Sequence, residues 1–168
     1  KEKGIIYIIE SDAGMQGGQT WEAIQIAVQH KLNNLVLLID DNSLQAMGET
    51  KKILDVRPLD KKLKAFDWSV AKINGHNFRQ IEKALSVKPN KPLAIIAKTI
   101  KGRGISFLEN KDGWHGKPVP PDMLEKALQE LGEVNLDLRV KVQIPNYIKL
   151  KTQNSPPKAD QPLAEKLK

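Results

Sequence analysis

Two apolar runs, each followed closely by polar residues, are the feature that most constrains how this chain can fold. Residues 5–9 and 35–39 are rich in isoleucine, leucine and valine, which predicts two buried strands. Asp12 follows the first run, and Asp41 with Asn42 follows the second. If the strands are parallel neighbours, these side chains meet at one edge of the sheet. Carboxylate and amide oxygens there suit a magnesium or calcium ion that carries a phosphate group.

The composition sets limits on the class of protein. A length of 168 residues fits one domain with a tail. No apolar run approaches the roughly 20 residues needed to span a bilayer. The amino-terminal residues lack the apolar stretch of a signal peptide, and the absence of cysteine excludes disulfides and thiolate chemistry. We therefore expect a cytoplasmic protein with no membrane partner.

The formal net charge of +7 allows three interpretations. Basic chains bind nucleic acids through phosphate contacts, but here the lysines are scattered and aromatic residues make up only 5% of the chain. No aromatic platform alternates with basic residues, so nucleic acid is an unlikely partner. The alternatives are a solvated lysine-rich surface and the attraction of phosphorylated metabolites.

Strand and helix signals alternate along the chain, which predicts an α/β fold with an open, mostly parallel sheet and helices on both faces. We expect a domain over residues 1–132 and a carboxyl-terminal extension or linker over 133–168, with an edge strand near 140–144. Residues 40–50 and 98–121 are expected to be loops. The expected strands cover 4–9, 68–73 and 92–97 beside 35–39, and the expected helices cover 19–31, 53–64 with a break at Pro58, 77–86 and 123–131.

Several linked motifs resemble the thiamine-diphosphate-binding domain of the transketolase family. Residues 11–23 read SDAGMQGGQTWEA, where the family usually has GDGE(L/M)QEGQxWEA. Residues 34–45 read NLVLLIDDNSLQ and resemble NLxxIxDxNxxQ, at the family's separation. The segments FDW at 66–68, INGHN at 73–77, KPLAIIAKTIKGRGISFLEN at 91–110 and WHG at 114–116 continue the resemblance. It covers about residues 4–132 and implies part of the thiamine-diphosphate-binding fold, incomplete at its amino-terminal side.

The resemblance implies a metal site and a cofactor site. Asp12, Asn42 and the backbone carbonyl of Leu44 would ligate Mg²⁺ or Ca²⁺, which would bridge the two phosphates of thiamine diphosphate. His115 would approach the diphosphate and the substrate hydroxyls and act as a catalytic group in proton transfer. The other expected cofactor-binding residues are Ser11, Ala13 and Gly14 in the glycine-rich turn, and Ala46 with Leu44 beside the thiazolium ring.

The chain departs from the family pattern around Asp12. Ser11 and Ala13 replace both glycines, and Gly17 stands where the family has a glutamate at the subunit interface. If the second glycine position needs a positive φ, alanine there costs about 1 kcal/mol or more. The family's preceding segment and its pyrimidine-binding domain are also missing from the matched region.

The implied function is a transketolase-like transfer of a two-carbon ketol unit from a ketose phosphate to an aldose phosphate, as in the pentose phosphate pathway. This chain would supply the diphosphate and metal half-site. Its partners would be phosphorylated sugars and either a second copy in a dimer or a chain with the pyrimidine-binding domain. The alternative is a non-catalytic scaffold or assembly module that kept the fold and lost the chemistry.

Simpler structural roles remain open for single residues. An aspartate or asparagine after a strand is often a turn former or a helix cap. His76 is expected to bond the backbone near a turn rather than to bind a ligand. Trp21 and Trp68 are expected in the core.

Overall fold

The computed structural model describes residues 4–132, and all structural statements below concern that part. The predicted extension over 133–168, with its edge strand and linker, lies outside the described residues. The helices and strands follow one another along the chain as β1 (Ile6–Ser11), the 3-10 helix η1 (Gly14–Gln16), α1 (Gly18–Gln29), β2 (Leu35–Asp41), β3 (Leu44–Gln45), β4 (Gly48–Glu49), α2 (Thr50–Ile53), α3 (Leu59–Ala65), β5 (Ser69–Asn74), α4 (Phe78–Leu85), β6 (Leu93–Lys98) and α5 (Pro121–Leu131).

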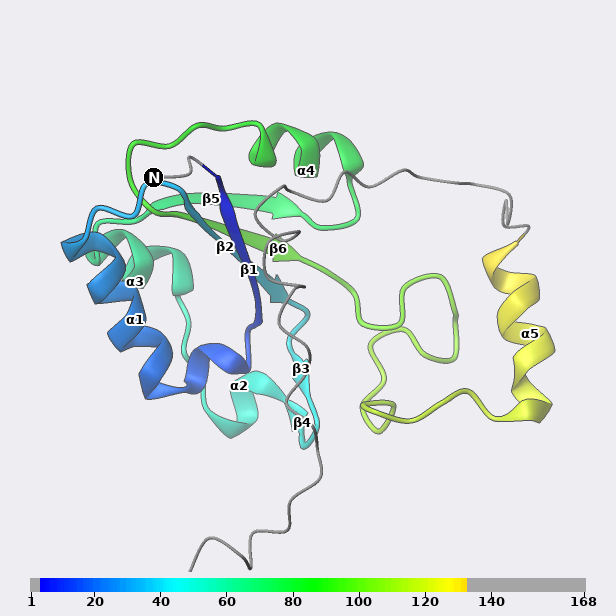
Figure 1. Cartoon of the computed structure of the whole chain (residues 1–168). Helices are drawn as coiled ribbons and strands as arrows, with labels where there is room; N and C mark the ends of the chain where they lie inside the picture. Colours follow the sequence, from blue (N-terminus) through cyan, green and yellow to red (C-terminus); the bar gives the residue numbers. More distant parts are fainter. Residues whose placement is uncertain (1–3, 133–168) are drawn as a thin grey trace, which may run out of the picture. The chain divides into compact units, whose positions relative to one another are not determined.

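Four strands form a parallel sheet in the order β1-β2-β6-β5 (Figure 1). The register pairs Ser11 with Asp40, so β1 and β2 end side by side. Asp41 in turn pairs with Lys98 at the end of β6. The carboxyl ends of three neighbouring strands therefore share one edge of the sheet. The two strand-end motifs predicted this arrangement for β1 and β2.

Helices cover both faces of the sheet, as expected for this fold class. Alternate residues of β6 face opposite sides: Ala94 and Ile96 belong to one buried cluster and Ile95 to the other. The larger cluster holds residues of α1 and α3, whereas the smaller one holds Ala84 of α4. Figure 1 shows α1 and α3 on one side of the sheet and α4 on the other.

The expectation of a buried first strand is wrong. Strand β1 begins two residues later than expected, and its side chains are largely exposed, Ile9 at 80%. The reason is its place at the edge of the sheet, where β2 is its only strand neighbour among residues 4–132. A run of isoleucines reads the same at an edge as in the centre, so the sequence pattern could not separate the two positions.

The segment expected as a loop over residues 40–50 contains a short antiparallel hairpin. Strands β3 and β4 pair through two residues each, with Gly48 at φ 119. Helix α3 begins directly after Pro58, which confirms the predicted break, but residues 54–57 are not helical, and α2 lies at 50–53, mostly within the segment expected as a loop. The predicted cap of α4 is also confirmed, since the Asn77 side chain accepts a hydrogen bond from the Gln80 N–H.

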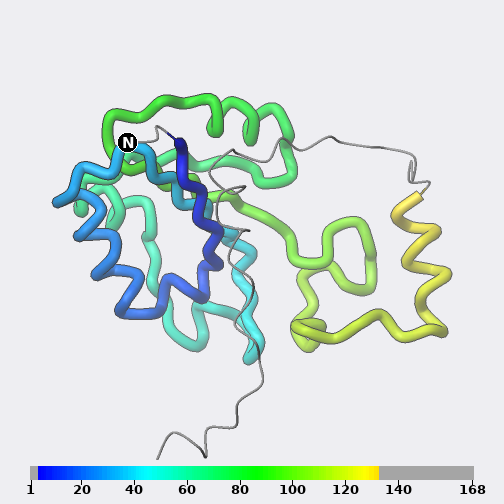
Figure 2. The backbone as a smooth tube through the Cα atoms, viewed as in Figure 1, coloured from blue at the N-terminus to red at the C-terminus, as the bar shows by residue number. Residues whose placement is uncertain are grey.

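A long loop joins β6 to α5 and turns back on itself before the helix begins (Figure 2). It contains no helix or strand between Lys98 and Pro121, as predicted. Glu130 of α5 bonds both the N–H and the hydroxyl of Ser106 in this loop. No helix in the described part is long and apolar enough to cross a membrane.

Candidate functional site

Asp12 joins the ends of β1 and β2. Its N–H donates to the Asp40 carbonyl at 3.0 Å, which continues the pairing of the two strands by one residue. Its carboxylate Oδ2 accepts the Ser43 N–H at 3.1 Å. The residue is 1% exposed, yet its Oδ1 has no hydrogen-bond partner. A buried carboxylate oxygen without a partner is costly, and a bound cation would satisfy it.

Asn42 forms a tight turn after β2. Its Nδ2 donates to Asp40 at 2.9 Å and its Oδ1 accepts the Leu44 N–H at 2.9 Å. The two bonds fix the orientation of the amide, with Oδ1 towards Leu44. This oxygen keeps a second lone pair that could accept a further ligand. Ser43 lies at φ 67 between them, a conformation that non-glycine residues adopt only when their surroundings hold it. The turn therefore fixes the Asn42 amide in the same segment whose Ser43 N–H donates to Asp12.

The oxygen donors at this edge fit a hard divalent cation. Besides Asp12, Asp41 keeps a buried Oδ1 without a hydrogen-bond partner. Residues 4–132 hold no cluster of three or more histidine, cysteine, aspartate or glutamate side chains suited to a metal. A site here would thus depend on one carboxylate, an amide and a carbonyl, a sparse set typical of Mg²⁺ held together with phosphates.

The charges around Asp12 oppose one another. Burial raises the pKa of the Asp12 carboxyl, and the negative charge of Asp41 raises it further. The neighbouring Thr50 hydroxyl lowers this pKa, and the positive charge of Arg57 lowers it by less. Arg57 Nη2 lies 3.9 Å from Asp12 Oδ2. Lys98 approaches Asp41 to 3.6 Å and also donates to the Ser43 hydroxyl at 2.7 Å. Asp12 and Asp41 therefore each have their own basic neighbour.

A cavity of about 260 Å³ opens beside the turn. Two of the predicted ligands, Asn42 and Leu44, line it together with Arg57. Ala46, predicted to lie beside the thiazolium ring, is exposed in the two-residue turn between β3 and β4. The other residues around this cavity are Ser43, Glu49, Lys51 and Asn110.

The turn between β1 and α1 is built without strain from the residues that replace the glycines. Ala13 has φ −70 and ψ −38, so the positive φ on which the expected conformational cost depended is not present. Ser11 uses its hydroxyl to accept the Gly14 N–H at 2.9 Å. A Cβ at Gly14 would lie 1.8 Å from Glu10 Oε1, so the glycine leaves room for that carboxylate. Glu10 also accepts the Ser11 N–H at 2.8 Å.

His115 lies in the long loop, exposed to solvent. Its Nδ1 is 3.2 Å from Lys101 Nζ. Within residues 4–132, no hydrogen bond or ion pair joins His115 to Asp12 or Asn42, and its role in the site stays a prediction. His76 has the structural role expected of it, since its Nε2 accepts the Ile100 N–H at 2.7 Å.

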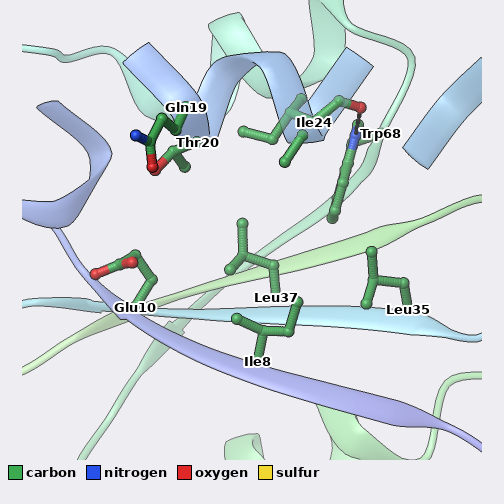
Figure 3. A pocket seen from close by; sticks show the side chains of 9 residues that line it. Ile8, Glu10, Gln19, Thr20, Ile24, Leu35, Leu37 and Trp68 are labelled. Carbon is green, nitrogen blue, oxygen red and sulfur yellow. Dashed lines mark hydrogen bonds between the residues drawn. The ribbon is translucent and has the colours of Figure 1, made fainter. Parts of the chain in front are cut away.

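A second cavity, of about 340 Å³, lies between α1 and the face of the sheet (Figure 3). Its walls are largely apolar, and none of the predicted site residues belongs to them. Trp68 closes one end and donates to the Ile24 carbonyl at 3.0 Å, whereas Glu10 lies at the other end. The residues around it are Ile8, Glu10, Gln19, Thr20, Ala23, Ile24, Leu35, Leu37 and Trp68.

Three functional candidates were not predicted from the sequence. Arg57 reaches Asp12 only through tertiary packing, and no sequence signal marks it. Glu10 was overlooked because it directly follows an apolar run. A carboxylate immediately before the polar turn is the sequence signal that could have identified it. Lys101 belongs to the motif at residues 91–110, but its pairing with His115 depends on how the loop folds.

A parallel α/β sheet with a buried carboxylate and an amide turn at its carboxyl edge defines a class of domains that bind phosphate-bearing ligands at the strand ends. Comparison with known proteins narrows this class. Residues 2–166 match the family described as transketolase, thiamine diphosphate binding domain. The chain belongs to this family.

Individual relatives agree with the assignment. The chain is 44% identical over 128 residues to one subunit of the apulose-4-phosphate transketolase of Actinobacillus succinogenes, covering 75% of this chain and 46% of that protein. One subunit of a 6-deoxy-6-sulfo-D-fructose transketolase of a Clostridium species is 37% identical over 129 residues, covering 75% and 47%. The crystal structure of transketolase from Campylobacter jejuni superposes with a TM-score of 0.70 at 30% identity, covering 88% of this chain and 23% of that one. This chain thus spans less than half of each.

Proposed function

We propose that this chain supplies the diphosphate and metal half of a transketolase site, which transfers a two-carbon ketol unit from a ketose phosphate to an aldose phosphate. The observation that carries the proposal is the buried Asp12 carboxylate, whose Oδ1 has no partner. It lies at the carboxyl ends of β1 and β2, next to the Asn42 turn. A divalent cation would satisfy this oxygen and link the protein to a diphosphate.

Each predicted residue has a role in holding the cofactor. Asp12, Asn42 Oδ1 and the Leu44 carbonyl would ligate Mg²⁺, and Ala46 would lie near the ring. In the turn formed by Ser11, Ala13 and Gly14, the N–H groups of Ser11 and Gly14 would exchange their present acceptors, Glu10 and the Ser11 hydroxyl, for phosphate oxygens. The first turn of α1 would offer further hydrogen-bond donors. The choice of ligands is supported by the family resemblance and by the oxygen chemistry of the turn.

The reactive carbon comes from the cofactor, since thiamine diphosphate supplies a nucleophile for breaking and making the bond next to a ketose carbonyl. His115 would hold and move protons at the substrate hydroxyls. If Lys101 donates to His115 Nδ1, the imidazole proton remains on Nε2. That nitrogen could then donate to a substrate oxygen, and closure of the loop would be needed to bring it there.

The reaction would need a second chain. Two relatives are named as subunits of transketolases, and we propose a partner that carries the pyrimidine-binding domain, or a second copy in a dimer. A cytoplasmic location and sugar phosphate substrates of the pentose phosphate type stay predictions of the same proposal.

The test combines the full chain with a candidate partner and measures ketol transfer between sugar phosphates. We expect activity only with both chains, thiamine diphosphate and Mg²⁺ present. Asp12→Asn should abolish it. Lys72→Gln, which removes an exposed lysine 3.8 Å from Asp60, should leave it unchanged. Full activity of the Asp12→Asn variant would contradict the proposal.

A second candidate, a non-catalytic assembly module, is favoured by the exposed apolar surface. Ile6 and Ile9 of β1 are 56% and 80% exposed, and Leu124 and Leu128 of α5 are 48% and 57% exposed. Apolar residues of this size suit protein contacts. This alternative predicts stable binding of the partner with no cofactor bound, which calorimetry on the assembled complex would detect.

A further inference from the structure

Arg57 is the basic side chain that faces Asp12 in the candidate metal site. Its Nη2 lies 3.9 Å from Asp12 Oδ2, and it is the only basic residue in an ion pair with Asp12 in the described part of the chain. The Asp12 side chain is 2% exposed and that of Arg57 is 34% exposed. Nη2 is itself buried and has no hydrogen-bond acceptor. The pair is therefore held by charge rather than by a short hydrogen bond.

The Asp55 side chain holds Arg57 in this position. Asp55 Oδ1 accepts the Arg57 N–H at 3.0 Å and lies 3.5 Å from its Nε. Lys98 is engaged with Asp41, and Lys51, which lies beside the same cavity, approaches Glu49 to 3.4 Å. Arg57 is thus the cation that balances the charge of Asp12.

A metal ion and Arg57 would compete for the same carboxylate. A buried carboxylate needs an opposite charge nearby, and the guanidinium supplies one in the metal-free protein. A divalent cation on Asp12 would experience repulsion from Arg57 over a few ångströms. Phosphate oxygens arriving with the metal would change this balance, because a guanidinium binds them readily.

We propose that Arg57 is a built-in counter-cation of the metal site, which opposes the binding of a divalent cation alone and favours its binding together with a diphosphate. This inference rests on the proposed function, since it takes Asp12 as a metal ligand. Its consequence is that the site accepts metal and diphosphate as a unit. Arg57 is then a positioning residue for the cofactor.

Two probes test the inference on the full chain assembled with its partner. The first is Mn²⁺ alone, with bound metal measured by electron paramagnetic resonance. Arg57→Gln should tighten Mn²⁺ binding by about tenfold, because a unit charge close to the metal is removed. Arg57→Lys should tighten it less, and Lys72→Gln, which removes a charge elsewhere, should not change it.

The second probe is the complex of Mg²⁺ with inorganic pyrophosphate, titrated by calorimetry. Arg57→Gln should weaken its binding by about tenfold, because a charged hydrogen bond to phosphate is lost. The two probes therefore shift in opposite directions. A merely structural role for Arg57 would shift both in the same direction, and circular dichroism identifies a variant that does not fold.

Three results would overturn the inference. Equal Mn²⁺ affinity in the wild type and Arg57→Gln would leave Asp12 as a ligand but remove the role of Arg57. An equal gain in Mn²⁺ affinity in Lys72→Gln would show that the effect comes from the net charge of the chain and not from the position of Arg57. Failure of every variant to bind either probe would overturn the metal site itself, and the proposed function with it.

Discussion

The Ser43 N–H donates to Asp12 Oδ2 at 3.1 Å across 31 residues of sequence. This bond ties the end of β1 to the turn after β2, so that Asp12 and Asn42 belong to one site. It also leaves Asp12 Oδ1 as the oxygen without a partner. The arrangement follows from two parallel strands that end in register, Ser11 beside Asp40.

Asp12→Asn should make the metal-free protein more stable at neutral pH. Burial raises the pKa of Asp12, so the protonated form is favoured in the folded state. The stability that this group contributes is fully present below its unfolded pKa and is lost as the pH rises through the folded value. Asparagine removes that loss. A gain of about 1 kcal/mol in the free energy of unfolding would raise the melting temperature by about 2–4 °C.

Calorimetry of both proteins at pH 4 and pH 7 checks this prediction. The difference in melting temperature between Asp12→Asn and the wild type should be larger at pH 7. A variant less stable than the wild type at pH 7, without metal, would show that the pair with Arg57 outweighs the burial of the charge.

Restoring both glycines should not improve the site. Ala13 has φ −70, so glycine relieves no strain there and costs about 0.5–1 kcal/mol through the flexibility of the unfolded chain. Ser11→Gly also removes the acceptor of the Gly14 N–H. We expect the Ser11→Gly/Ala13→Gly variant to bind Mg²⁺ and thiamine diphosphate no more tightly than the wild type in the assembled complex. A large gain in calorimetric affinity would mean that the two substitutions had damaged the site.

Glu10→Gln should tighten the binding of diphosphate. The carboxylate of Glu10 accepts the Ser11 N–H and lies over Gly14, in the turn expected to receive phosphate oxygens. Removing this negative charge should raise the affinity for Mg²⁺-pyrophosphate about threefold to tenfold. Glu22→Gln, on the exposed side of α1, is the matched control. An equal effect of the two variants would show that Glu10 does not face the ligand.

Acid should release α5 from the long loop before the sheet unfolds. The hydrogen bonds from the Ser106 N–H and hydroxyl hold the pKa of Glu130 below its ordinary value. This contribution to stability is present above the unfolded glutamate pKa of about 4.3 and is lost as the pH falls through the lowered folded pKa. Hydrogen exchange at the Ser106 amide, corrected for intrinsic rates, should accelerate below that pH. Glu130→Gln should remove this pH dependence, and its persistence in the variant would exclude Glu130 as the cause.

The sequence predicts the sheet edge well because local patterns determine it. Apolar runs mark the strands, and the polar residues after them mark the turns, so the sequence alone could place Asp12 and Asn42 together. The exposed position of Ile9 could not be predicted, because the order of strands in a sheet depends on long-range packing. The two-residue strands at Leu44 and Gly48 were missed for another reason: segments this short carry no periodic pattern.

The charged groups around Asp12 illustrate the same limit. Arg57 approaches Asp12 only because the segment between α2 and α3 folds back towards the strand ends, and an arginine in a lysine-rich chain is not conspicuous. The conformation of Ala13 was equally hidden, since the family pattern suggested a need for glycine that the backbone here does not have. Side-chain chemistry could be predicted from the residues, whereas its charge balance required the fold.

The most direct test of the account is Mg²⁺-dependent binding of thiamine diphosphate by the full chain assembled with its partner, measured by calorimetry for the wild type and Asp12→Asn. The account predicts that the wild type binds the cofactor only when Mg²⁺ is present, and that Asp12→Asn loses this Mg²⁺-dependent binding while it still assembles. Equal Mg²⁺-dependent affinity in the two proteins would contradict the assignment of Asp12 as the metal ligand.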